Sequence, residues 1–169
     1  MKSRNFLRTV FVGSLIPALA FGPIALTSTV SVAAPAASEA ECRVHSVLAQ
    51  KTGDGTIPDD LKFIGEQLRD DQFAAYKGFR LLGTQSLALK VKQPKLAPLT
   101  SGHKLSLEYL GAKDSKLQLH ATLMGGEKTL FNAIYGIDNN GLLMIGGVRS
   151  DGGKVFFAIQ CRLNELAGK

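Results

Sequence analysis

The chain has 169 residues, of which 45% are hydrophobic and 20% charged, and its formal net charge is +6. Its lysines are scattered, with no dense basic run and no alternation of basic and aromatic residues, which argues against a nucleic-acid-binding protein. The absence of tryptophan argues against a sugar-binding platform and against a lipocalin-like barrel.

Residues 1–36 have the organisation of a cleavable secretory signal peptide. Basic residues at positions 2, 4 and 8 precede the apolar segment Val10–Leu26, and a run of small residues follows at 31–37. Three cleavage sites place small residues at the −3 and −1 positions: after Ala33, after Ala36 and after Ala40. The sequence therefore predicts an exported protein that resides in the periplasm, on the cell surface or outside the cell.

The alternative for this segment is an uncleaved membrane anchor, because about 20 apolar residues are enough to span a bilayer. Pro17, Pro23 and the polar residues 27–29 interrupt the apolar run, so we expect cleavage and no membrane insertion afterwards. Removing the basic residues of the signal leaves 17 basic and 14 acidic residues, a net charge of +3. Roughly 130 residues remain, enough for one hydrophobic core, and we predict a single β-rich domain over 37–169.

Cys42 and Cys161 are the only cysteines, and they lie near the two ends of the expected domain. In an oxidising compartment such a pair forms a disulfide, so we predict a Cys42–Cys161 bond that closes nearly the whole domain into one loop. Two buried free thiols, or a bond to a second chain, are the alternatives. Nothing in the sequence sets the oligomeric state.

The domain begins with a predicted strand at 43–49, which ends at turn-forming residues. The spacing of the apolar residues then changes to that of a helix. Leu61, Ile64 and Leu68 recur at helical spacing, and polar residues occupy the other face. These residues predict one amphipathic helix over 58–70.

After the helix, apolar segments of strand length alternate with turn signals. This pattern predicts six more strands: Phe79–Val91, His103–Leu110, Lys116–Met124, Thr129–Tyr135, Leu142–Val148 and Lys154–Cys161. The proline-containing segment 93–102 is the one long connection. The expected fold is mainly β: a single antiparallel sandwich or barrel-like meander of about seven strands, with one amphipathic helix near the N-terminus.

Two dipeptides, Asn140-Gly141 and Asp151-Gly152, predict two-residue hairpin turns because both tolerate the positive φ of a type I′ turn. The resulting register places one set of residues on a shared core face: Tyr135, Ile137, Met144, Val148, Val155, Phe157, Ile159 and Cys161. In that register Phe157 lies opposite Gly146 and covers it.

The opposite face of these last strands is apolar as well, and therefore needs a cover. Its apolar residues are Ile134, Leu143, Ile145, Phe156 and Ala158. Three covers are compatible with the sequence: the predicted helix, the sheet folded back on itself, or a partner protein or small apolar ligand bound to this second sheet face.

The run Ile57-Pro58-Asp59-Asp60-Leu61 leads to Gln72-Phe73-Ala74-Ala75-Tyr76-Lys77-Gly78-Phe79-Arg80-Leu81-Leu82, followed by Leu87-x-Leu89. This pattern resembles that of uncharacterised secreted bacterial proteins in which a short amphipathic helix precedes a β meander. The resemblance implies an envelope or secreted domain and carries no activity, cofactor or catalytic residue with it.

The sequence contains no recognisable catalytic or metal-binding motif. The three histidines, His45, His103 and His120, have no second ligand at metal-site spacing. We therefore predict no catalytic residue, no cofactor and no metal ligand, and an exported non-enzymatic binding or envelope accessory domain. The alternative is a small secreted hydrolase or ligand carrier whose site assembles in three dimensions, around His103 or His120.

Overall fold

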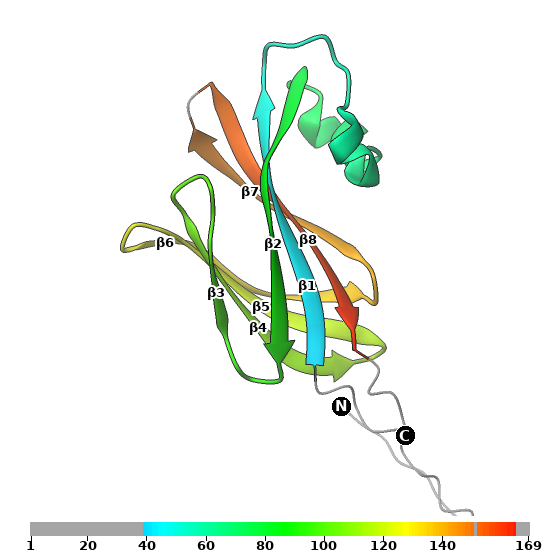
Figure 1. The fold of residues 1–169 in the computed structure, drawn as a ribbon, viewed down its shortest axis with the longest axis vertical. Helices are drawn as coiled ribbons and strands as arrows, with labels where there is room; N and C mark the ends of the chain where they lie inside the picture. The colour runs from blue at the N-terminus through cyan, green and yellow to red at the C-terminus, as the bar shows by residue number, and fades with distance from the viewer. Residues whose placement is uncertain (1–38, 151, 165–169) are drawn as a thin grey trace, which may run out of the picture. The chain divides into compact units, whose positions relative to one another are not determined.

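Two four-stranded antiparallel sheets form the β-sandwich in this computed structural model, which describes residues 39–150 and 152–164 (Figure 1). One sheet has the order β2-β1-β8-β7 and the other the order β3-β4-β5-β6. The strands are β1 (Glu39–Gln50), β2 (Gly78–Lys90), β3 (Lys95–Pro98), β4 (Lys104–Lys113), β5 (Lys116–Gly125), β6 (Lys128–Asp138), β7 (Leu142–Ser150) and β8 (Gly153–Leu163). The predicted signal peptide and Asp151 lie outside the described residues.

The core lies between the two sheets. It contains alternate residues of their strands, because successive side chains of a strand point to opposite faces of the sheet. Leu105, Leu107 and Tyr109 of β4 are fully buried there, and so are Phe157 and Ile159 of β8. The described chain is therefore mainly β, as the sequence predicts.

The eighth strand, β3, lies inside the segment that the sequence assigns to a connection. It pairs with β4 through Lys95–Leu107 and Pro98–Lys104, at the edge of its sheet. Proline lacks a backbone N–H. It is tolerated on an edge strand, because one side of that strand forms no backbone hydrogen bonds to a neighbouring strand. The prolines that made this segment resemble a loop are thus compatible with a short edge strand.

The predicted α-helix is wrong, because the segment forms three short 3₁₀ helices: η1 (Asp59–Ile64), η2 (Gln67–Arg69) and η3 (Asp71–Phe73). Asp70 has an extended backbone with ψ 153°, which ends any continuous helix at that point. The three apolar residues that suggested the helix are nevertheless buried: Leu61, Ile64 and Leu68.

These helical turns cover the second face of the β2-β1-β8-β7 sheet. Leu61, Ile64 and Phe73 pack in one cluster with Val47 of β1 and Ala158 of β8, while Phe156, Met144 and Leu142 lie against the same cluster. The first of the three expected covers, the chain's own helical segment, is therefore present over Phe156 and Ala158. Ile134, predicted for the same face, instead belongs to the other sheet and is 61% exposed.

A bulge in β7 changes which of its residues face the main core. The register of β7 and β8 shifts between Gly146 and Val148, and both Gly146 (φ 117°) and Gly147 (φ 95°) adopt backbone angles that favour glycine. Because one residue is added there, Leu143 and Ile145 face the main core. The predicted placement of Met144 in that core is wrong, and so is the pairing of Gly146 with Phe157, since Gly146 pairs with Phe156.

The predicted hairpin at Asn140-Gly141 is also wrong, because β6 and β7 belong to different sheets. A type I′ turn needs positive φ at both central residues. Asn140 has φ 61°, whereas Gly141 has no positive φ, and the Gly141 amide donates to the Asp138 carbonyl at 2.8 Å. A turn with positive φ only at its third residue matches type II, which splays the flanking strands and here directs them into separate sheets. By contrast, the second hairpin pairs Val148 with Val155 as predicted.

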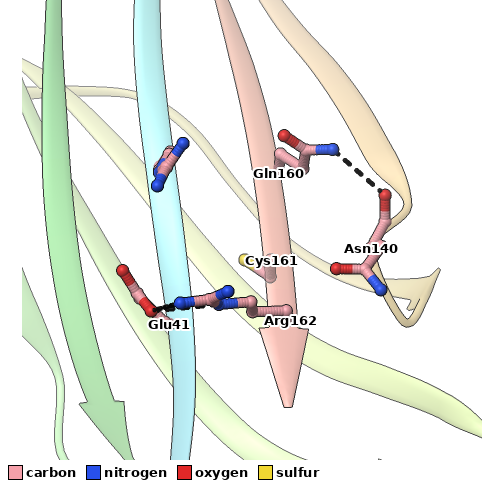
Figure 2. A pocket seen from close by; sticks show the side chains of 6 residues that line it. Glu41, Asn140, Gln160, Cys161 and Arg162 are labelled. Atoms are coloured by element: carbon pink, nitrogen blue, oxygen red, sulfur yellow. Dashed lines mark hydrogen bonds and ion pairs between the residues drawn. The ribbon is translucent and has the colours of Figure 1, made fainter. Parts of the chain in front are cut away.

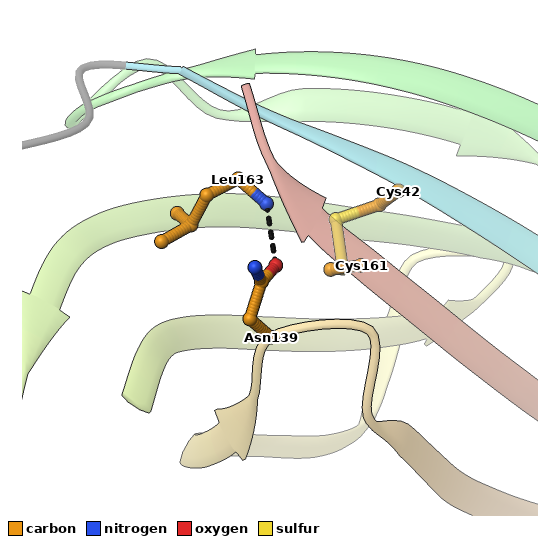
Figure 3. The surroundings of a disulfide bond; sticks show 4 residues. All are labelled: Cys42, Asn139, Cys161 and Leu163. Atoms are coloured by element: carbon orange, nitrogen blue, oxygen red, sulfur yellow. Dashed lines mark hydrogen bonds between the residues drawn. A yellow bond between two sulfur atoms is a disulfide. The ribbon is translucent and has the colours of Figure 1, made fainter. Parts of the chain in front are cut away.

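The disulfide expected between Cys42 and Cys161 joins directly paired residues of β1 and β8 (Figure 3). Both cysteines are fully buried. The β6–β7 connection docks beside them: the Leu163 amide donates to the Asn139 side-chain oxygen at 2.8 Å, and the Asn140 amide donates to the Cys161 carbonyl at 2.9 Å. Such a bond is consistent with an oxidising environment.

Replacing both cysteines, Cys42→Ala with Cys161→Ala, is expected to lower the free energy of unfolding by about 4–5 kcal/mol. The bond joins residues separated by 119 positions, so without it the unfolded chain regains the entropy of a long open loop. Urea unfolding measures the difference. As a control, reductant should destabilise the wild type and leave the double variant unchanged; a loss below about 1 kcal/mol would contradict this role of the bond.

Candidate functional site

His45 lies where the helical turns meet the sheet. Its Nδ1 is 2.9 Å from Thr84 Oγ1 on β2, and its ring centroid is 4.4 Å from that of Phe63 on η1. Burial, and secondarily the charge of Arg43, lowers the pKa of His45, which favours the neutral ring. His45 therefore acts as a packing residue at this junction.

His103 precedes β4 and contacts Ser101 and the end of β5. Its Nδ1 lies 3.0 Å from both the carbonyl and the hydroxyl oxygen of Ser101. Its ring also lies against Gly125, where an added Cβ would be 3.4 Å from a ring carbon. These contacts fix the conformation of the chain immediately before β4.

His120 lies at the centre of a polar row across the outer face of the β3-β4-β5-β6 sheet. Its Nδ1 lies 3.3 Å from Glu108 Oε2, and its Nε2 lies 2.6 Å from Asn132 Oδ1. Two oxygen partners favour the doubly protonated, charged imidazolium. The bond with Asn132 and then that with Glu108 raise the pKa of His120.

This geometry does not favour general-base catalysis by His120, because both of its ring nitrogens are already engaged by neighbouring side chains. Among the described residues His103 contacts the Ser101 hydroxyl but no carboxylate, and His120 contacts the Glu108 carboxylate but no hydroxyl, so neither forms a hydroxyl–histidine–carboxylate arrangement. No group of three or more described His, Cys, Asp or Glu side chains is arranged to hold a metal ion.

A small polar depression of about 150 Å³ lies on β1 and β8 beside the disulfide (Figure 2). Most of its polar groups bind one another. Arg162 donates to Glu41 Oε2 through Nε at 3.0 Å and through Nη2 at 2.5 Å, and the Gln160 side chain donates to the Asn140 carbonyl at 3.3 Å. The bond with Arg162 also lowers the pKa of Glu41. These pairs stabilise the ends of the paired strands, and they leave few polar groups of the depression free to bind a ligand.

The basic groove is a second hollow, of about 340 Å³, at the β7–β8 turn. It is lined by Lys51, Thr52, Tyr76, Arg149, Ser150, Gly152, Gly153 and Lys154. One wall is rigid, because the Tyr76 ring packs edge-on against Phe156 with centroids 5.9 Å apart. The groove thus combines an aromatic wall with three exposed basic side chains.

The charges of the basic groove are unbalanced within the described residues. Arg149 of β7 and Lys154 of β8 are directly opposite each other in the sheet, and no described carboxylate forms an ion pair with either of them or with Lys51. Like charges directly opposite in an antiparallel pair are destabilising. Among the described residues the groove therefore carries three cations and no paired carboxylate; Asp151, which lies between Ser150 and Gly152 in the sequence, is outside the described residues.

Sequence reasoning missed both the basic groove and the partners of His120, although a signal for the groove was present. The correctly predicted pairing of Val148 with Val155 already places Arg149 opposite Lys154. The partners of His120 were harder to find, because they depend on three strands being in register, with a bulge between Leu123 and Met124 in the β5–β6 pairing.

Comparison with known proteins gives no relative: no family model, no curated protein and no solved structure matches this chain. Among the described residues, no helix is both long and apolar enough to cross a membrane.

Substituting Asn132→Ala is expected to lower the pKa of His120 toward its ordinary value of about 6.5, because the bond to Asn132 contributes most to the upward shift. A raised pKa means that this contact stabilises the fold below the ordinary histidine pKa and that the contribution is lost as pH rises through the folded-state pKa. NMR titration of the imidazole protons measures the shift. Thr122→Ala, on the same sheet face, serves as the control, and an unchanged titration in the Asn132 variant would contradict the assignment.

Proposed function

We propose that this protein is an exported, non-enzymatic binding domain whose ligand is a small molecule with an anionic head group and an apolar body. The proposed site is the basic groove. The observation that carries the proposal is the direct opposition of Arg149 and Lys154 without a described acidic partner. An anion between them would turn a repulsive pair into two charge-assisted contacts.

The shape and lining of the groove support a small amphipathic ligand. Its volume of about 340 Å³ falls in the range of small-molecule sites, and Tyr76 offers an aromatic surface beside the cations.

The non-enzymatic part of the proposal is supported by the state of the histidines. Both ring nitrogens of His120 are engaged by Glu108 and Asn132, and His45 and His103 contact neighbouring side chains and backbone. Export is supported by the N-terminal sequence pattern, together with the Cys42–Cys161 disulfide, which suits an oxidising compartment.

Calorimetric titration of the purified exported protein with octyl phosphate tests this function, with octyl glucoside as the neutral probe of equal chain length. We expect octyl phosphate to bind and octyl glucoside to bind at least tenfold more weakly. The double substitution Arg149→Gln with Lys154→Gln should weaken octyl phosphate binding roughly tenfold or more, because two charged contacts are removed.

Lys113→Gln is the matched control, since Lys113 is an exposed lysine at the end of β4, outside the groove. It should leave binding unchanged. Equal binding of both probes, no binding of octyl phosphate, or binding that is indifferent to the Arg149 and Lys154 substitutions would each contradict the proposed site.

A further inference from the structure

A larger hollow, of about 690 Å³, lies along the helical turns. We call it the helical hollow; its lining comes from positions 62–74 of the helical segment, from positions 55–57 of the loop after β1, and from Tyr76 and Phe79. Its volume falls in the range of small-molecule sites. Tyr76 is the one residue that lines both this hollow and the basic groove, so the two hollows present different polar groups.

The buried part of the lining is apolar and largely aromatic. Leu68, Phe73 and Phe79 are buried, and Tyr76 is half-buried. The Phe73 ring holds these groups together, because its centroid lies 6.4 Å from that of Tyr76 and 6.3 Å from that of Phe79. Packed rings of this kind offer a preformed apolar surface to a ligand.

The exposed part of the lining carries three charged side chains, Lys62, Glu66 and Arg69. The charge of Lys62 is balanced by an ion pair with Asp59 at 2.7 Å. Within the described residues, by contrast, neither Glu66 nor Arg69 forms an ion pair or a side-chain hydrogen bond. The hollow therefore has one free carboxylate and one free guanidinium on its lining.

These two free groups lie on the same helical turn. Glu66 and Arg69 are three positions apart, a spacing at which opposite charges commonly pair with each other. Here the guanidinium lies beside Gly65 instead, where its Nη1 would be 3.8 Å from an added Cβ. Because the two unpaired charges have opposite signs, they complement a ligand with two opposite poles better than a simple anion or cation.

The placement of the poles also restricts the form of the ligand. Both free charges belong to one turn, whereas the aromatic residues form the buried part of the same lining. A ligand that matches this arrangement has its ammonium and carboxylate groups at one end and its apolar body at the other. A free α-amino acid with a large apolar side chain has this form.

We propose that the helical hollow binds a free apolar amino acid. Arg69 donates hydrogen bonds to the ligand carboxylate, and Glu66 accepts them from the ligand ammonium group. The apolar side chain of the ligand lies against Phe73, Tyr76 and Phe79. This site is separate from the basic groove and does not depend on the function proposed for that groove.

Calorimetric titration of the purified exported protein with phenylalanine tests the proposal. Three related probes each lack one recognised feature: acetylated phenylalanine lacks the ammonium group, phenylalanine amide lacks the carboxylate, and glycine lacks the apolar body. We expect phenylalanine to bind roughly tenfold more tightly than each of these probes, because each one loses a contact with a charged group or with the apolar surface.

Substitution of each free charge assigns the two poles. Glu66→Gln should weaken phenylalanine binding roughly tenfold and remove the preference over acetylated phenylalanine, because the ammonium group no longer has a carboxylate to contact. Arg69→Gln should weaken binding by a similar factor and remove the preference over phenylalanine amide. Glu127→Gln, an exposed position in the β5–β6 turn outside the hollow, is the matched control and should bind like the wild type.

No binding of phenylalanine would overturn the proposal, and so would equal binding of the blocked probes or binding that is indifferent to both substitutions. The Arg149→Gln and Lys154→Gln double variant should bind phenylalanine normally; a loss there would place the ligand in the basic groove and contradict this site. Conversely, failure of octyl phosphate to bind would contradict the function proposed for the groove and leave this inference standing. Circular dichroism and the presence of the Cys42–Cys161 bond verify that each variant is folded.

Discussion

The pairing of the first strand with the last is the constraint on which the rest of this structure depends. Strand β1 lies between β2 and β8 and pairs with β8 from Ala40–Leu163 to Gln50–Gly153, with the Cys42–Cys161 bond near one end. Everything between these strands is one long loop, whose closure costs entropy that the disulfide largely removes from the unfolded state. The disulfide and the β1–β8 ladder therefore join the two ends of the described domain.

This constraint limits where a binding surface can lie. From Val44 to Ala49, strand β1 is buried on both faces, by the opposing sheet on one side and by the helical turns on the other, so this part of its sheet offers no binding surface. The basic groove lies outside this covered region, where β7 turns into β8. The proposed site thus uses a place that the packing of β1 and β8 leaves open.

Much of the fold follows from sequence alone, because alternation of apolar residues marks each long strand and because two cysteines in an exported chain have one intramolecular pairing. The errors come from local backbone geometry that composition does not reveal. Asn140-Gly141 has the composition of a hairpin turn but only one positive φ, and the glycine pair in β7 adds a residue to the strand and exchanges the faces of Met144 and Ile145. The partners of His120 likewise depend on register, so residue spacing could not identify them.

Native-state amide hydrogen exchange, followed by NMR, tests the central role of the β1–β8 pair most directly. If this pair holds the domain together, the amides of Val44 in β1 and Ile159 in β8 exchange only through global unfolding, at least as slowly as that of Leu119 in β5. Exchange of Val44 and Ile159 that is clearly faster than that of Leu119 would show that the paired ends open while the other sheet stays folded, and would contradict the account.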